Sequence, residues 1–295
     1  MKLIGCIFVG NEKLMVKYVM PYLKYYNYDK LYLYDNSTDG TIDLIKSYNY
    51  PFIEIIDAHD ISNLSVIQDY EAYRRKIEVE FFEKLKKEAK ETGEEIWFSF
   101  MDFDEIVFVE RYINNGFKMY LWELSISAHV NYYAAPSAQL VSGYETCEEL
   151  DFVMEKQHQK LVHGINGMDC IAWSYWGTKV SSIKVNDFER FYFDDGNHCG
   201  KGHMENGVAP INAYDFGNFF TFHLKFLTKE HYMYKMNTMY VNRYNCTSLD
   251  FEEEYFYRMI STKFPVNLVF YDDFLKHSYQ CKGIGFGNIG GLTLV

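Results

Sequence analysis

Hydrophobic runs alternate with helix-type patterns over the first hundred residues. Four short runs rich in apolar, β-branched and aromatic residues have the pattern of strands, at residues 3–9, 31–34, 52–56 and 96–101. Between them, apolar side chains recur every three or four positions, as in helices, at residues 13–26, 41–48 and 65–92. Alternation of strands and helices is typical of a parallel sheet covered by helices. The sequence therefore predicts an α/β fold.

The helix predicted over residues 65–92 is the clearest element of the chain. One face is apolar and is formed by Ile77, Phe81, Phe82, Leu85 and Ala89. Gly93 follows where helices commonly end in a left-handed glycine. The remainder is rich in Lys and Glu, which at i, i+4 spacing form a solvated surface. We therefore expect a long amphipathic helix on the surface.

The second half of the chain changes character twice. Residues 106–226 are strand-rich and irregular, with clusters of Gly, Asn and Asp. After residue 228 the pattern is helical again, at residues 229–236, 251–261 and 266–276, and the tail from residue 283 is glycine-rich. No internal repeat or low-complexity linker interrupts the chain. We therefore expect one domain over residues 1–295, made of segments 1–110 and 111–227 and a helical C-terminal portion 228–295.

Composition narrows the classes of protein and of partner. Hydrophobic residues make up 48% of the 295 residues and charged residues 24%, as in soluble globular proteins. The net charge of −12 argues against a nucleic-acid partner, because phosphate backbones require a basic surface. The six Cys are scattered without a C-x-x-C motif, which indicates reduced thiols. With no signal-peptide pattern, we expect a cytoplasmic protein, with peripheral contact at the inner membrane face left open.

Acidic residues follow the last predicted strand of the N-terminal segment. Asp102 and Asp104 come directly after the apolar run, and Glu105 adjoins them. On an extended strand, residues i and i+2 point to the same side, so the two aspartates would face one point. Two carboxylates suit Mg²⁺ or Mn²⁺, which take further ligands from a substrate's phosphates. The pair therefore predicts a diphosphate-bearing substrate.

Polar clusters also follow two other strands of the predicted sheet. The first strand leads into Gly10-Asn11-Glu12, and the second leads into a run that begins at Asp35 and ends at Thr41. Such residues after a strand usually form only a turn. In an open parallel sheet, however, ligands bind beyond the carboxyl ends of the strands. Three strand ends followed by polar residues at one edge predict a binding site there, in which Asp35 could bond a base or a ribose.

These three clusters together resemble a known family. Their order and spacing are similar to nucleotide-sugar glycosyltransferases of the GT-A fold, in the family-2-like branch with an N-E … D-N-x-S-x-D-G-T … D-x-D-E series. The resemblance covers residues 1–110 and thins beyond them. It implies a GT-A-like, mostly parallel central sheet flanked by helices. It also implies a hexosyltransferase dependent on Mn²⁺ or Mg²⁺, moving sugar from a nucleoside-diphosphate sugar to a hydroxyl of a glycan or lipid-linked glycan. The composition, with Lys, Tyr, Asn and Ile in place of Arg and Ala, separately suggests a role in surface-glycan assembly.

The resemblance also assigns roles to individual residues. Contacts to the nucleotide would come from Val9, Asn11, Glu12, Asp35 and Gln68, with the backbone of residues 9–11 lining the base pocket. Asp102 would reach the ribose or the metal, and Asp104 would bind the metal directly. The usual family-2 loop carries a second acid where this chain has Asn36.

Further metal ligands and a base are expected from the second half of the chain. His223 is our candidate for the next metal ligand, although a histidine at a strand end is also commonly a hydrogen-bonded core residue. Lys225 could offset diphosphate charge. An inverting reaction needs a base that deprotonates the acceptor hydroxyl. The candidates are Asp169, Asp194, Asp195 and Glu205, of which Asp169, between Met168 and Cys170 before a strand, looks most like a pocket residue.

Other readings of the chain are weaker but stay open. A sugar nucleotidyltransferase shares the sheet and the metal but normally has a Gly- and Arg-rich loop after the first strand, where this chain has Val9-Gly10-Asn11-Glu12-Lys13. A non-catalytic nucleotide- or carbohydrate-binding module is the second alternative. Residues 198–203 read as a glycine-containing loop whose amides could approach phosphate. The motifs of kinases, dehydrogenases and α/β-hydrolases are missing from the sequence.

Overall fold

The structure is a computed structural model of the 295-residue chain. It describes residues 1–58, 67–108, 116–141, 146–149, 151, 172–193, 201–213, 220–224, 228, 230–231 and 234. The described residues fall into two compact units. The first comprises Met1–Glu105, Val109–Ala135 and Gly177–Gly217, and the second comprises Ile106–Phe108, Pro136–Trp176 and Asn218–Val295. The expectation of a single domain stays a prediction, and each unit is described by itself.

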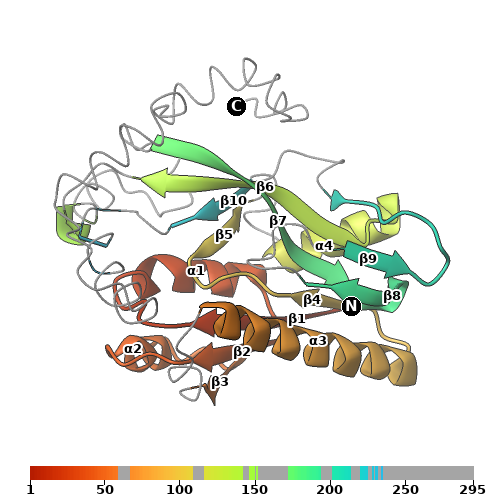
Figure 1. The fold of residues 1–295 in the computed structure, drawn as a ribbon, viewed down its shortest axis with the longest axis horizontal. Coiled ribbons are helices and arrows are strands. Elements are labelled where there is room, and N and C mark those ends of the chain that lie inside the picture. The colour runs from red at the N-terminus through yellow and green to blue at the C-terminus, as the bar shows by residue number, and fades with distance from the viewer. Residues whose placement is uncertain are drawn as a thin grey trace. The chain divides into compact units, whose positions relative to one another are not determined.

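The first unit is built on a mostly parallel sheet (Figure 1). Its strands are β1 (Lys2–Val9), β2 (Lys30–Asp35), β3 (Ile53–Asp57), β4 (Ile96–Ser99) and the end of β7 (Ala172–Lys184). They lie in the order β3-β2-β1-β4-β7. The first four run parallel, whereas β7 runs antiparallel to β4, with Trp97 opposite Lys184. The predicted α/β fold with a mostly parallel sheet is thus confirmed, and the four predicted strands match within two residues at each end.

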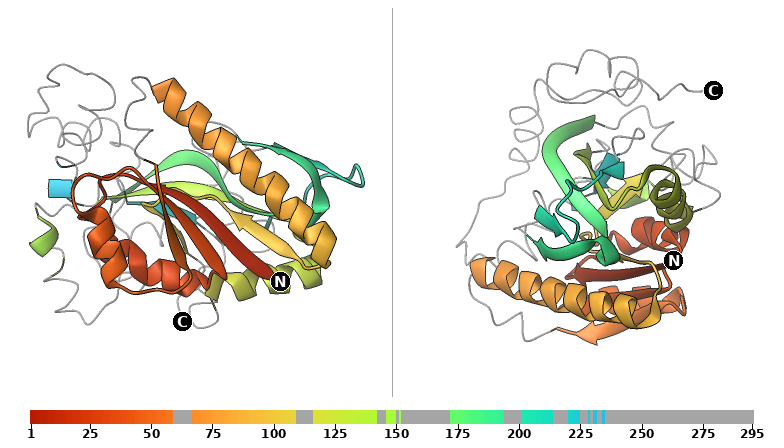
Figure 2. Two further views of the ribbon diagram at one scale, coloured as in Figure 1. Left: turned by 90° about the horizontal axis from the view of Figure 1, so that it is seen from below. Right: turned by 90° about the vertical axis from the view of Figure 1, so that its right-hand side faces the viewer.

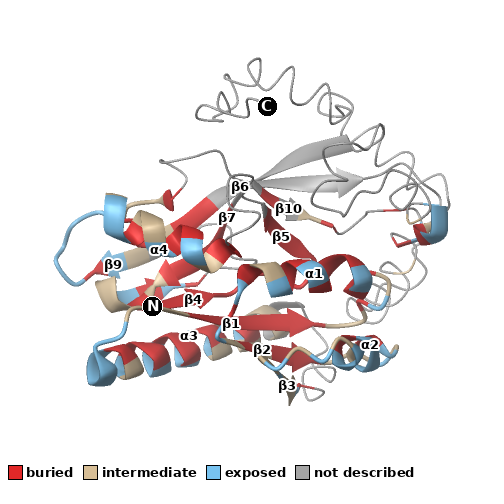
Figure 3. Cartoon of the chain, turned by 180° about the vertical axis from the view of Figure 1, so that it is seen from behind, coloured by how far each residue is buried: buried red, intermediate tan, exposed pale blue. Residues whose placement is uncertain are grey.

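Helices cover both faces of this sheet. They are α1 (Val16–Tyr26), α2 (Thr41–Ser47), α3 (Ile67–Thr92) and α4 (Gly116–Ala128). In the left view of Figure 2, α3 lies on one side of the strands, and α1 and α4 lie on the other. α3 is the long helix that the sequence predicts, and Gly93 ends it with a positive φ of 70°. The alternation of buried and exposed residues along α3 is visible in Figure 3.

The core between α3 and the sheet is rich in aromatic rings. Side chains at alternate positions of β1 and β4 point toward α3, because residues i and i+2 of a strand share a face. Phe98 of β4 has no exposed surface, and its ring centre lies 6.1 Å from that of Phe81 and 5.4 Å from that of Phe100. Phe193 completes the cluster, and its ring centre lies 4.8 Å from that of Phe100. This core fixes the position of α3 against β4, on which the candidate site depends.

A two-stranded hairpin packs against α3. The short 3-10 helix η3 (Val185–Asp187) leads into β8 (Phe188–Tyr192), which pairs antiparallel with β9 (Lys201–Met204). The expectation of a loop over residues 198–203 is therefore wrong for its second half. Gly202 is required there because a Cβ atom would lie 2.1 Å from the ring of Phe188. That ring, which has no exposed surface, covers the glycine.

The sequence pattern missed helix α4. It lies within residues 106–226, which we expected to be strand-rich. Its sequence, GFKMYLWELSISA, has apolar residues on all sides and several aromatic and β-branched residues that favour strands. A helix without a polar stripe gives no 3.6-residue period. Tertiary packing decides it instead: the ring of Phe117 lies 5.6 Å from that of Tyr26 at the end of α1.

The second unit contains β10 (Phe220–His223) and, from Pro136 onward, β6 (Tyr132–Val141). The two strands pair in parallel, with Thr221 opposite Ser137 and His223 opposite Gln139. Strand β5 (Glu105–Phe108) belongs to it from Ile106 onward. The predicted helices over residues 251–261 and 266–276 lie outside the described residues. The helical C-terminal portion therefore stays a prediction.

Among the helices of the described ranges, none combines the length and the apolar character needed to cross a bilayer. The expected location of the protein stays a prediction.

Replacing Phe98 by Ala tests the core that holds α3. We expect a loss of about 3–5 kcal/mol in the free energy of unfolding, because the deletion leaves a cavity among rings that cannot collapse together. Val79→Ala, at a position of α3 that is 42% exposed, is the control and should change it by less than about 0.5 kcal/mol. Chemical denaturation measures both. Equal losses in the two variants would contradict this description of the core.

Candidate functional site

The loops that follow β1 and β2 are bonded to each other. The backbone N–H of Asn11 donates to Ser37 Oγ at 3.1 Å, and the N–H of Thr38 donates to Asn11 Oδ1 at 2.8 Å. The N–H of Glu12 donates to Thr41 Oγ1 at 2.9 Å. Asn11 has a positive φ of 54°, a conformation that Asn tolerates better than most residues. The two polar clusters therefore meet at one edge of the sheet, as the sequence predicts.

The acids of the second loop also shape the loop itself. Asp35 Oδ1 accepts the N–H of Ser37 at 2.7 Å, which closes a turn on its own backbone. Asp39 Oδ1 accepts the N–H of Thr41, the first residue of α2, at 3.0 Å. Gly40 precedes the helix with a φ of 89°. Part of the motif that carries the family resemblance thus has a structural role, and Asp35 itself is 6% exposed.

The acidic cluster after β4 forms a turn. β4 ends at Ser99, and Phe103 and Asp104 are turn residues. The N–H of Glu105 donates to the carbonyl oxygen of Asp102 at 3.1 Å, and Glu105 Oε2 accepts the N–H of Asp102 at 3.3 Å. The expectation that Asp102 and Asp104 extend the strand and share a side by i, i+2 alternation is therefore wrong. Reciprocal bonding between Asp102 and Glu105 bends the chain instead.

Two buried cations hold the carboxylate of Asp102. Arg74 of α3 bonds Oδ1 through Nη1, and Lys179 of β7 lies 3.1 Å from Oδ2. Arg74 also bonds Glu78 at 3.0 Å, and Lys179 also forms an ion pair with Glu105 at 2.8 Å. The side chains of Arg74 and Lys179 are 6% and 4% exposed, against 24% for Asp102. Asp102 is thus the part of this cluster that faces solvent most.

The charges of this cluster support one another. Burial alone would lower the pKa of Lys179, but the carboxylates of Asp102 and Glu105 outweigh it and raise that pKa above its ordinary value. Burial acts in the same direction on Arg74, and Asp102 and Glu78 again reverse it, so that the pKa is raised. Both cations therefore stay charged at physiological pH.

Arg74 also connects Asp102 with the end of β1. Its guanidinium lies 5.8 Å from the ring centre of Phe8, and its Nη2 lies 3.5 Å from the carbonyl oxygen of Phe100. Phe8 is the residue before Val9, from which the first polar loop departs. The ring of Phe8 stacks on Tyr34, 5.1 Å away, beside Asp35. The three carboxyl ends thus lie along one edge of the sheet.

The described residues around Asp102 do not by themselves make a metal site. A divalent cation on Asp102 would have to approach a carboxylate that already binds two buried cations, and like charges in a poorly solvated region repel strongly. Within the described ranges, no group of three or more His, Cys, Asp or Glu is placed to hold a metal ion. Asp104 is 6% exposed. Metal binding at Asp102 and Asp104 stays a prediction.

The remaining predicted residues lie in several places. Val9 and Glu12 are buried at the carboxyl edge of the sheet. Gln68 lies in the first turn of α3, and its side chain is not described. His223 ends β10 in the second unit. Residues predicted as a base or a cation that lie outside the described residues are Asp169, Asp194, Asp195 and Lys225.

The sequence did not single out Arg74 or Lys179. A signal for Arg74 exists: it lies three residues before Ile77 and seven before Phe81, so it falls on the apolar stripe of α3, where a charge requires a buried partner. Lys179 gives no comparable signal, because its strand is mixed polar and apolar. Only the antiparallel pairing of β7 with β4 brings it to the carboxyl edge.

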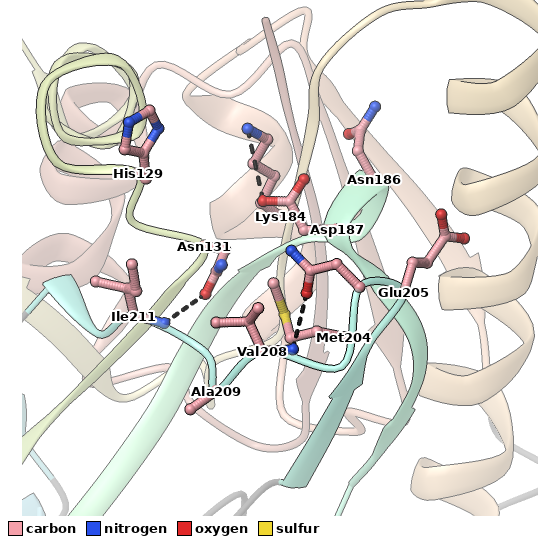
Figure 4. Close-up of a pocket in the computed structure, with 11 residues that line it drawn as sticks. His129, Asn131, Lys184, Asn186, Asp187, Met204, Glu205, Val208, Ala209 and Ile211 are labelled. Carbon is pink, nitrogen blue, oxygen red and sulfur yellow. Dashed lines mark hydrogen bonds and ion pairs between the residues drawn. The ribbon is translucent and has the colours of Figure 1, made fainter.

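A pocket of about 430 Å³ lies at the opposite, amino-terminal edge (Figure 4). Its polar side chains bond the surrounding backbone: Asn131 Oδ1 accepts the N–H of Ile211 at 2.8 Å, and Asn186 Oδ1 accepts the N–H of Ile96 at 2.9 Å. Glu205 at its rim pairs with Lys86 at 3.4 Å and Lys90 at 3.3 Å. These roles are structural, and they place Glu205 at the edge remote from Asp102, which disfavours it as the base.

Comparison with known proteins gives likenesses of fold only. No family model matches the chain, and no curated protein matches it. It is similar to the crystal structure of S. aureus TarS, with a TM-score of 0.30 and 14% identity over 50% of this chain and 22% of that one. It is also similar to the structure of S. aureus TarS 1–349, with a TM-score of 0.28 and 13% identity over 50% of this chain and 36% of that one. At TM-scores of this size neither likeness bears on function, and the chain spans well under two thirds of both proteins.

Replacing Asp102 by Ala should destabilise the protein. The change leaves Arg74 and Lys179 buried with fewer partners, and breaking a buried pair costs about 3 kcal/mol or more. We expect a loss of about 2–4 kcal/mol, because Asp102 is itself partly solvated. The control is Asp43→Ala, an exposed position on α2 with little expected effect. A stability unchanged by Asp102→Ala, measured by urea denaturation, would contradict the cluster.

Replacing Asp187 by Asn should stabilise the protein at neutral pH. Burial raises the pKa of Asp187, against the opposing effect of Lys184, so its ionised form is disfavoured in the folded state. For a carboxyl whose folded pKa is raised, this penalty is present at pH 7 and disappears as the pH falls below its ordinary value of about 4. The gain in melting temperature over wild type should therefore be present at pH 7 and shrink toward pH 4. A variant less stable than wild type at pH 7 would refute this.

Proposed function

We propose that the protein is a glycosyltransferase that moves a sugar from a nucleoside-diphosphate sugar to a hydroxyl acceptor. The observation that carries the proposal is the meeting of three polar loops at one edge of a parallel sheet. The loops after β1 and β2 are bonded through Asn11 and Ser37, and Arg74 links the end of β1 to Asp102. This is the edge at which open α/β sheets bind ligands.

The chemistry of that edge supports a nucleotide. A base at this edge would meet the side-chain amide of Asn11 and the carboxylate of Asp35. The side chain of Asp102 is 24% exposed, and its carboxylate is an acceptor for hydroxyl groups. Asn11 and Gly40 both have a positive φ, so each turns the backbone of its loop at this edge. Such a set of fixed polar groups over an apolar floor is typical of a small-molecule site.

The finer parts of the proposal come from the family resemblance of residues 1–110. They are Mn²⁺ or Mg²⁺ as cofactor, a hexosyl donor, a glycan or lipid-linked glycan as acceptor, and work at the inner face of the membrane. When bound, such a metal would stabilise the departing diphosphate as a Lewis acid. Asp104 is the candidate ligand, because Asp102 already binds two cations.

Nucleotide binding tests the proposal directly. Titrating UDP, GDP and CDP into the protein by calorimetry, with and without Mn²⁺, should give a dissociation constant in the micromolar range for one of them. Asp35→Asn keeps the acceptor for Ser37 N–H but removes a charge, and should weaken that nucleotide about tenfold. Asp43→Asn, on the exposed face of α2, is the matched control.

The outcomes separate the alternatives. Binding followed by hydrolysis or transfer of the sugar supports a transferase, and binding without turnover of any nucleotide sugar indicates a non-catalytic module. Consumption of a sugar phosphate with a nucleoside triphosphate would instead identify a nucleotidyltransferase. Absence of affinity for all three nucleotides, with and without Mn²⁺, would refute the proposed function.

A further inference from the structure

We propose that Lys179, together with Arg74 and Glu105, positions the carboxylate of Asp102 to accept the ribose hydroxyls of the nucleotide donor. The inference rests on the proposed function and adds a role for a lysine on β7, a strand outside the segment that carries the family resemblance. It follows from the way these side chains enclose Asp102.

Lys179 and Glu105 fix both the backbone and the side chain of Asp102. The ammonium of Lys179 lies 3.1 Å from Asp102 Oδ2 and 2.8 Å from Glu105 Oε1. The other oxygen of Glu105 accepts the N–H of Asp102 at 3.3 Å. These contacts close a ring through three side chains and one backbone amide. Asp102 can therefore neither rotate its carboxylate nor shift its backbone without breaking a buried ion pair.

Arg74 completes the clamp from the other side of the carboxylate. It bonds Oδ1, and its own position is fixed by Glu78 at 3.0 Å and by the ring of Phe8 at 5.8 Å. Each oxygen of Asp102 thus faces a cation that comes from a different element, α3 or β7. A planar group held at both oxygens presents one fixed edge to solvent, which is the requirement for a preorganised acceptor.

Exposure decides which member of the cluster can meet a ligand. Arg74 and Lys179 are 6% and 4% exposed, and Glu78 and Glu105 are 1% and 2% exposed. Asp102 is 24% exposed. A ligand at this edge therefore contacts the carboxylate, and the two cations act on it through Asp102. Lys179 and Arg74 are positioning residues in this scheme.

The charge of the clamp selects the kind of group that Asp102 accepts. A hydroxyl donor carries no net charge, so the two buried cations do not repel it. Ionised carboxylates accept stronger hydrogen bonds than neutral groups do. Neighbouring hydroxyls, such as the 2′ and 3′ groups of a ribose, suit a carboxylate edge of this kind.

The same strand provides a matched control. Lys184 of β7 also lies between two carboxylates, 3.1 Å from Glu95 and 3.7 Å from Asp187. It lies opposite Trp97 in the register, toward the amino-terminal edge of the sheet. Removing its charge disturbs a comparable ion cluster at the wrong end of the sheet for the proposed donor site.

The experiment compares a nucleotide with its 2′,3′-dideoxy analogue. The nucleotide is whichever of UDP, GDP and CDP the wild type binds most tightly, in the buffer, with or without Mn²⁺, that supports this binding. Calorimetry gives both affinities for wild type, Lys179→Met, Lys179→Arg and Lys184→Met. The wild type should bind the dideoxy analogue at least about tenfold more weakly than the nucleotide, because the analogue loses the hydrogen bonds to a charged group.

Lys179→Met should lose this discrimination, so that both ligands bind with nearly equal, weakened affinity. Lys184→Met should keep it, and Lys179→Arg should keep part of it. Circular dichroism checks that each variant folds. If Lys179→Met does not fold, Lys179→Gln and Arg74→Lys are used in its place. A merely structural lysine would weaken both ligands alike and leave their ratio unchanged.

Full discrimination in folded Lys179 and Arg74 variants, or none in the wild type, would overturn the inference while leaving the proposed function in place. Absence of nucleotide binding by the wild type would overturn both.

Discussion

The burial of charged side chains is the main constraint on this structure. Arg74 and Lys179 are placed under the sheet edge, where an ion without a partner would cost several kcal/mol of desolvation. Both are therefore tied to carboxylates, and Asp102 takes one bond from each. The α3 helix, the turn after β4 and the antiparallel strand β7 must then keep a fixed relation to one another. The result is a carboxylate that is held at both oxygens and lies at the carboxyl edge of the sheet.

The candidate site is thus built from two kinds of loop. The loops after β1 and β2 are held mainly by hydrogen bonds from backbone N–H groups to short polar side chains, such as that from Asn11 to Ser37. The turn after β4 is held by the charged side chains of Arg74 and Lys179, which belong to α3 and β7. Both arrangements stand on the aromatic core around Phe98, which carries no charge and leaves α3 no freedom to slide. Rigid packing below and fixed polar groups above are what a site for a specific small molecule requires.

Several features of the fold and the site followed from the sequence. The parallel strands, α1, α2, α3 and the C-terminal Gly93 of α3 were predicted because each has a local periodicity or a turn residue that states its conformation. The meeting of the clusters at Glu12 and Asp35 was predicted because parallel strands end at one edge. Helix α4 was missed, since an apolar residue on every side removes the period, and the extended geometry of Asp102 and Asp104 was wrong because the side chain of Glu105 bends the chain back.

By itself, the sequence determined which segments are strands and helices in the first unit and which polar residues lie at the strand ends. These properties depend on neighbours within a few positions, so the order of residues contains them. The tertiary structure alone decided that Arg74 and Lys179, separated by more than a hundred residues, share the carboxylate of Asp102. That contact depends on the pairing of β7 with β4 and on the packing of α3, and the cost of burying a charge is known only once it is known what lies against it.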